Sequence, residues 1–134
     1  MKYSKVKFLT FFAIICSVGL APINDASAVT TFVDAFDVSD EDTNPKNAVF
    51  NSDGTKMFVA GAIGDDINEY ACDAFDVSTC FFVDSKDVSA QETNPWGIAF
   101  NSDGTKMFVT GNISDNVNEY ACDAFDVSTC VFTD

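Results

Sequence analysis

The 134-residue sequence contains no histidine. Its absence excludes Ser-His-Asp and Cys-His catalysis, zinc sites with histidine ligands and the usual general base at neutral pH. Arginine is absent as well, and 7 lysines stand against 21 Asp and Glu residues, for a net charge of −14. Because nucleic-acid binding depends on Lys and Arg contacts to phosphate, we expect no nucleic-acid partner. The acidic surface is either a solvated surface suited to a salty medium or one that attracts cations.

Residues 1–28 have the three-part layout of a secretory signal peptide. Three lysines come first, Phe8 to Leu20 is an apolar run, and the small residues Ala26-Ser27-Ala28 follow. The run has 13 residues, whereas a helix needs about 20 to span a bilayer. We therefore predict a signal-peptide helix that is cleaved after Ala28, which leaves a net charge of −16. The product is expected to be secreted, periplasmic or at the cell surface, without membrane contact; an uncleaved membrane anchor is the alternative.

From residue 29 onwards, apolar residues do not recur at the 3.6-residue spacing of an amphipathic helix. Long segments are instead repeated at an offset of 50 residues. Asn51 to Val59 returns unchanged as Asn101 to Val109, and Asn68 to Cys80 returns unchanged as Asn118 to Cys130. Periods of about 40 to 50 residues with short strands are typical of β-propeller blades.

The pattern within one period predicts four short strands joined by polar turns. In the second copy these are the apolar run Gly97 to Phe100 and the alternating segments Lys106 to Thr110 and Val117 to Ala121. Cys80 to Val88, rich in Phe and Val, is the expected outer strand of the first copy, and Thr30 to Val38 resembles it. The predicted organisation is all-β: a signal peptide (1–28), a leading outer strand and loop (29–47), and two four-stranded antiparallel repeats (48–88 and 89–134).

Four cysteines follow the predicted cleavage site, and their even number in an exported chain indicates disulfides. Cys72 and Cys80 are eight residues apart, as are Cys122 and Cys130. We expect one bond within each pair, closing the connection between the third and fourth strands. Swapped pairing between the repeats is an alternative that needs a less local geometry. A zinc site of four thiolates is a third interpretation. The eight-residue spacing of the cysteines counts against it, because zinc ribbons have the tighter Cys-x₂-Cys spacing.

These segments resemble the repeats of secreted bacterial β-propeller proteins of the broad YVTN, NHL and lactonase-like groups. The resemblance is carried by the string Thr93 to Val109, followed by Asp115, Val117, Glu119 and Tyr120. The first copy departs from it, with Lys46-Asn47-Ala48-Val49 in place of Trp96-Gly97-Ile98-Ala99. The resemblance implies β-propeller-type blades and says little about function, because this fold carries binding proteins, hydrolases and scaffolds alike.

Blade topology implies that the outer-to-inner loops share one face with the loops between second and third strands. These loops are rich in oxygen-bearing side chains, which suit a hard cation such as Ca²⁺, but Asp and Asn also build turns. Trp96, the one tryptophan, is expected near the channel mouth, either as a stacking platform for a sugar or peptide or as a packed aromatic. The candidate ligand-binding residues are Glu41, Asp42, Asn44, Asp65, Asp66, Glu92, Asn94, Trp96, Asp115 and Asn116.

A propeller typically closes with about four to eight blades, and this chain carries two. Three interpretations remain open. The chain is a fragment of a longer repeat protein, or a homo-oligomer in which three or four copies complete a ring, or a small disulfide-stapled two-sheet protein.

The expected function is that of a secreted binding or interaction module with a protein or glycan partner. The alternatives are a calcium-dependent, lactonase-like hydrolase and a purely structural segment of a repeat array. Because the usual catalytic set is missing, an enzyme is the less favoured class, and no catalytic residue or certain cofactor is assigned.

Overall fold

The computed structural model describes residues 31–134, so the predicted signal peptide lies outside the described residues. Residues 31–134 form two four-stranded antiparallel sheets and contain no helix. In this part of the chain, accordingly, no helix is long and apolar enough to cross a membrane. The all-β prediction is confirmed for these residues.

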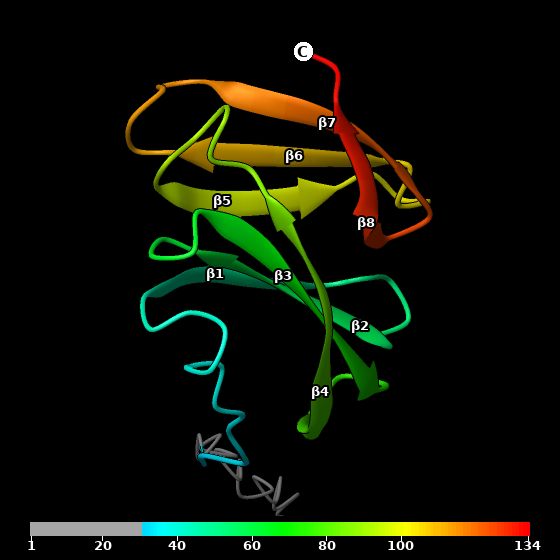
Figure 1. Ribbon diagram of the computed structural model, residues 1–134. Helices are drawn as coiled ribbons and strands as arrows, with labels where there is room; N and C mark the ends of the chain where they lie inside the picture. Colours follow the sequence, from blue (N-terminus) through cyan, green and yellow to red (C-terminus); the bar gives the residue numbers. More distant parts are fainter. Residues whose placement is uncertain (1–30) are drawn as a thin grey trace, which may run out of the picture. The chain divides into compact units, whose positions relative to one another are not determined.

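The first sheet has the order β1-β2-β3-β4, so each strand pairs with its neighbour in the sequence (Figure 1). The strands are β1 Pro45–Phe50, β2 Lys56–Gly61, β3 Asp66–Asp73 and β4 Asp76–Asp87. The register shifts once between β1 and β2 and twice between β3 and β4. Sequential antiparallel pairing is what short turns between strands allow.

The second sheet repeats this order, with β5 Pro95–Phe100, β6 Lys106–Gly111, β7 Val117–Asp123 and β8 Asp126–Phe132. It differs from the first sheet in its last strand. β4 pairs with β3 from Asp66 onwards. β8 and the two residues after it bond to β7 only from Glu119 onwards. The first residues of β7 are therefore paired on one side alone.

The hairpin turns between first and second strands follow from the repeated sequence Asn-Ser-Asp-Gly-Thr. The Asp53 carboxylate accepts hydrogen bonds from the backbone N–H and the hydroxyl group of Thr55, at 3.0 and 2.6 Å. Gly54 has a φ of 74°, in the left-handed region that glycine enters without steric cost. The second copy repeats both features. Local sequence is thus sufficient to form both turns.

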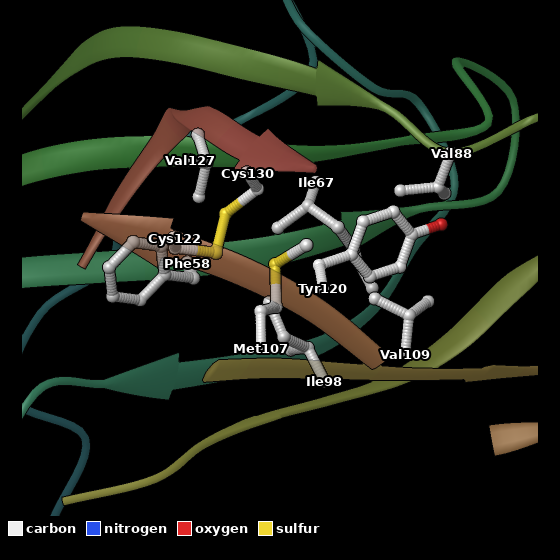
Figure 2. Packing of buried hydrophobic residues seen from close by; sticks show 11 residues of the cluster. Phe58, Ile67, Val88, Ile98, Met107, Val109, Tyr120, Cys122, Val127 and Cys130 are labelled. Atoms are coloured by element: carbon white, nitrogen blue, oxygen red, sulfur yellow. A yellow bond between two sulfur atoms is a disulfide. The ribbon is translucent and has the colours of Figure 1, made fainter. Parts of the chain in front are cut away.

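The two sheets pack against each other through one apolar cluster (Figure 2). Phe58, Ala60 and Ile67 of the first sheet are fully buried in it, together with Val88 from the connection between the sheets. Burial stabilises such a contact by about 25 cal/mol for each Å² of apolar surface. The second sheet contributes Ile98, Met107, Val109, Tyr120, Cys122, Val127 and Cys130.

A second, smaller cluster lies on the other face of the first sheet. It contains Met57, Val59, Tyr70, Cys72 and Cys80. The segment before β1 covers part of this cluster with two partly buried side chains, Phe36 and Val38. The Phe36 ring packs edge to face on the Tyr70 ring, with 5.4 Å between centroids.

Both expected disulfides, Cys72–Cys80 and Cys122–Cys130, are present. Each joins the end of a third strand to the fourth strand of the same sheet. This pairing contradicts both the swapped pairing and the four-thiolate zinc site. Two disulfides within one chain favour an oxidising environment for the protein.

The predicted leading strand is not formed in the described part of its segment. Residues 31–38 have no strand conformation, and Phe32 and Val33 are 83% and 89% exposed. A strand must pair its N–H and C=O groups with a neighbouring backbone. In residues 31–134, β3 is paired along its length with β4 and β7 is paired with β8 from Glu119 onwards, and residues 31–38 pair with neither sheet.

Candidate functional site

The loop before each inner strand lies against the loop after each second strand, as the sequence predicts. In the first sheet Asp42 connects them. Its carboxylate accepts hydrogen bonds from the backbone N–H groups of Ile63 and Gly64, at 2.8 and 2.7 Å. The same carboxylate also accepts a hydrogen bond from the backbone N–H of Asn44. We call the surface formed by these loops in the two sheets the loop face.

Glu92 holds the equivalent position in the second sheet. Its carboxylate accepts hydrogen bonds from the backbone N–H groups of Asn94 (2.9 Å) and Ile113 (3.2 Å). Ser114 donates two more, from its N–H at 3.0 Å and its hydroxyl at 2.7 Å. Burial by itself raises the pKa of Glu92, but these hydrogen bonds outweigh it and lower the pKa below its usual range. Glu92 is therefore a carboxylate whose acceptors are used within the protein.

Two glycines make room for these carboxylates. Gly61 and Gly111 end β2 and β6, and a Cβ atom on either would overlap the carboxylate of Asp42 or Glu92. The two acidic residues are only 3% and 1% exposed. Sequence analysis treated them as ligand candidates and missed their contacts with the loop backbone. The glycine at the end of each second strand is the signal that could have indicated such a close approach.

Asp66, the first residue of β3, lies among other carboxylates. Burial is the main cause that raises the pKa of Asp66, to about 6. The neighbouring negative charges add to this effect, while a hydrogen bond from the Asn68 amide, at 2.8 Å, opposes it. The neighbouring carboxylates are Asp42, Asp87 and Asp65. The second sheet has the neutral Asn116 at this position, so this carboxylate is particular to the first sheet.

Glu41 contacts a buried tyrosine rather than lying free. The Tyr70 hydroxyl donates to Glu41 Oε2 at 3.2 Å, and the equivalent Tyr120 hydroxyl donates to Gln91 Oε1 at 3.1 Å. Burial, and then the charge of Glu41, raise the pKa of Tyr70 far above its usual range. Burial raises the pKa of Tyr120 to about 12. Both tyrosines therefore stay neutral and act as donors to the loop face.

Asp65 and Asp115 are turn residues, with φ values of 53° and 56°. Aspartate is one of the few residues besides glycine that adopts this left-handed conformation readily. Asp115 and the adjacent Asn116 are exposed, and Asp65 is partly exposed. Asp115, Asn116 and Asn44 are the exposed ones among the acidic and amide candidates on the loop face.

Trp96 and Lys46 meet where β5 and β1 begin. Trp96 is 49% exposed, and its indole N–H donates to Asn94 Oδ1 at 3.2 Å. The Lys46 ammonium lies 5.6 Å from the centroid of the Trp96 ring, within the range of a cation–π contact. Lys46 also donates to Asn44 Oδ1 at 3.0 Å. We call these four residues the Trp96 surface; sequence analysis noted Lys46 only as a departure from the repeat pattern.

Within residues 31–134, no group of three or more Cys, Asp or Glu side chains is arranged to hold a metal ion. The Ca²⁺ interpretation of these loops therefore has no ligand cluster to support it in the described part of the chain. No family model, curated protein or solved structure matches this chain. We therefore argue its function from the geometry of the loop face.

Proposed function

We propose that this chain is a secreted binding module of β-propeller-type blades, and that a glycan binds at the Trp96 surface. The supporting observation is a half-exposed indole ring flanked by amide groups. An aromatic face offers apolar contact area, and polar groups at its rim fix the orientation of a ligand. Sugars present both kinds of surface.

The position of Trp96 supports the same proposal. Its indole N–H is already bonded to Asn94, so the ring is held in place before a ligand arrives. Rigid side chains lose little conformational freedom on binding, which favours affinity. In a β-propeller, the beginning of an inner strand lies beside the central channel, where such proteins commonly bind their ligands.

The signal-peptide pattern and the two disulfides support a secreted, periplasmic or cell-surface location. The calcium-dependent hydrolase is not developed further, because no observation on the loop face favours it over a binding module. A protein partner in place of a glycan remains an outcome of the test.

The test is a glycan array probed with the exported wild-type protein and with two variants. Trp96→Ala is expected to weaken binding at least tenfold. Ile113→Ala, which changes another exposed apolar side chain of the loop face, is the matched control and should leave binding unchanged. Because the chain has a single tryptophan, fluorescence titration with a soluble array hit reports on the site directly.

Equal binding by wild type and Trp96→Ala would place the ligand elsewhere. If no glycan binds, the same three proteins are used as bait in envelope extracts. Retention of a partner by wild type and Ile113→Ala, but not by Trp96→Ala, would then identify a protein ligand.

A further inference from the structure

The contact between the two sheets is built from residues that the sequence repeats. Each sheet therefore carries a copy of both surfaces that meet in this contact. We call the face with Lys56, Phe58 and Glu69 the back face of the first sheet, and the face with Met57 and Tyr70 its front face. The second sheet has the same two faces, 50 residues further along the sequence. In the structure the back face of the first sheet packs on the front face of the second.

An ion pair between the buried Glu69 and the partly exposed Lys56, whose side chain is 30% exposed, bridges this contact. Glu69 is 2% exposed, and its Oε1 lies 2.7 Å from the Lys56 ammonium. Glu69 Oε2 accepts a hydrogen bond from the Val127 N–H at 3.0 Å. The Lys56 ammonium donates to the Phe125 carbonyl oxygen at 2.9 Å. The pair on the back face therefore holds the β7–β8 loop of the other sheet.

The back face of the second sheet carries the same pair, and no loop among residues 31–134 bonds to it. Lys106 and Glu119 are also 2.7 Å apart, but their side chains are 50% and 32% exposed. Val117 is 66% exposed, whereas its counterpart Ile67 is fully buried. A hollow of about 280 Å³ lies on this face, and its lining includes Ala99, Phe108, Thr110 and Val117.

The front face of the first sheet is covered only in part, by Phe36 and Val38 of the segment before β1. Phe75 in the β3–β4 loop is 57% exposed, whereas its counterpart Phe125 packs against the core between the sheets. A groove of about 450 Å³ lies on this face, between the segment 34–38 on one side and Met57, Val59 and Val77 on the other. An apolar face of this kind is typical of an interaction surface.

The exposed β3–β4 loop already has the conformation that the ion pair holds in the other copy. Ala74 and Phe75 have φ values of 38° and 69°, and Ala124 and Phe125 have 41° and 65°. The sequence from Ala71 to Cys80 is identical to that from Ala121 to Cys130, including the disulfide. The β3–β4 loop therefore has the same sequence and backbone conformation as the β7–β8 loop, which the back face of the first sheet binds.

The backbone hydrogen bond at the edge of the contact between the sheets also has counterparts on the two free faces. The Val88 N–H donates to the Asp65 carbonyl oxygen at 2.9 Å, where the chain passes from one sheet to the next. The counterparts of these residues are Val38, before β1, and Asp115, before β7. Beside Asp115, the Asn118 amide nitrogen is buried and has no hydrogen-bond partner. Its counterpart in Asn68 donates to Asp66.

We propose that the back face of the second sheet binds the front face of the first sheet of a second copy of this chain. Lys106 and Glu119 hold the Phe75 carbonyl group and the Val77 N–H of that copy. The proposal rests on the blade interpretation given above and names the partner of these two faces. Because the faces differ, the contact repeats head to tail and closes a ring when the rotation permits. Three or four copies supply six or eight sheets, within the usual range of propellers.

The test is the mass of the exported protein in solution, measured by light scattering on four proteins. Val117→Asp places a charge on the back face of the second sheet. Phe75→Asn removes the apolar side chain from the front face of the first sheet, and asparagine tolerates the left-handed conformation there. Ile113→Asp is the control, because Ile113 is exposed to a similar extent (62%) and lies on the loop face.

Wild type and Ile113→Asp are expected at three or four times the mass of one chain, and the other two variants at the mass of one. An equimolar mixture of Val117→Asp and Phe75→Asn should contain a dimer, since each variant keeps the face that the other lacks. A single cooperative melting transition of each disulfide-bonded variant confirms that it is folded, at a lower temperature than wild type because association stabilises the folded state.

Three results would overturn the proposal: a monomeric wild type, a Val117→Asp variant with the mass of wild type, or a mixture that stays monomeric. The glycan measurement separates this proposal from the proposed function. A monomer that binds glycan through Trp96 would overturn only the assembly. An assembled ring whose ligand binding does not depend on Trp96 would overturn only the Trp96 site.

Discussion

Lys56 and Glu69 in the first sheet, and Lys106 and Glu119 in the second, form the same ion pair at the same 2.7 Å. Glu69 is almost completely buried, while Glu119 keeps a third of its side chain exposed. The strands that carry the two pairs have nearly the same sequence, so the strand itself does not set this difference. The second sheet packs over the pair of the first sheet, whereas the pair of the second sheet is exposed to solvent. The two copies thus form a built-in comparison between a contact made and a contact left free.

The largest expected difference concerns Ile67 and Val117. Ile67→Ala leaves a cavity in the core between the sheets and is expected to lower the free energy of unfolding by about 2–5 kcal/mol. Val117→Ala changes an exposed side chain and should stay within about 0.5 kcal/mol. Urea unfolding in the Phe75→Asn background, which removes self-association, measures both. Equal losses would contradict the asymmetry of the two faces.

The second comparison is between the contributions of the two ion pairs to the free energy of unfolding. Glu69→Ala leaves the Lys56 ammonium and the Val127 N–H without their acceptor in a buried contact, so we expect a loss of about 3 kcal/mol. The matched Glu119→Ala breaks a solvated pair, with an expected loss of at most about 1 kcal/mol. Both are measured by urea unfolding in the same background. A larger loss for Glu119→Ala would show that the burial of the pair does not determine its contribution.

The two disulfides close loops of equal length, so loop entropy alone predicts equal contributions of about 2–3 kcal/mol. Their surroundings differ, because Cys122 and Cys130 lie in the core between the sheets and Cys72 and Cys80 do not. Replacing the Cys122–Cys130 pair by alanines should therefore cost more than replacing the other pair. Thermal unfolding of the two double variants decides this. Equal melting temperatures would mean that the core adds nothing to the loop effect.

The smallest effect concerns the loop face, where Asp66 has Asn116 as its counterpart. Burial raises the folded-state pKa of Asp66 to about 6, above its ordinary value of 3.8. Its contribution to stability is therefore fully present below pH 4 and is lost as the pH rises through 6. Asp66→Asn, which copies the second sheet, should remove this decrease. Unfolding midpoints of both proteins at pH 4, 5, 6 and 7 test this, and parallel curves would contradict it.

Much of the strand arrangement follows from the sequence. Gly97 to Phe100 and Lys106 to Thr110 were predicted as strands, and β5 and β6 contain them. The Cys72–Cys80 bond follows from the equal spacing of the cysteines in the two copies. These features are local, because alternation, turn residues and short cysteine spacings act over a few residues.

The candidate site was less accessible to sequence reasoning. Asp42 and Glu92 stand in loops among other acidic residues, and nothing nearby in the sequence marks them as buried. Each accepts one hydrogen bond from a residue two positions further on, but the other partners are 21 or 22 residues away, on the loops after β2 and β6. The leading strand predicted over Thr30 to Val38 is not formed in its described part, residues 31–38. The segment has the composition of an outer strand, but strand pairing requires a neighbour that composition does not reveal.

The sequence by itself determined two repeated four-stranded units, their turns and their disulfides, because each depends on residues close together in the chain. Only the tertiary structure decided which of the repeated faces is covered. Glu69 and Glu119 are identical in sequence context, and hydrophobic burial depends on what packs against a surface rather than on the residues within it. The structure likewise separated the buried carboxylates Asp42 and Glu92 from the half-exposed Trp96, because exposure results from long-range contacts.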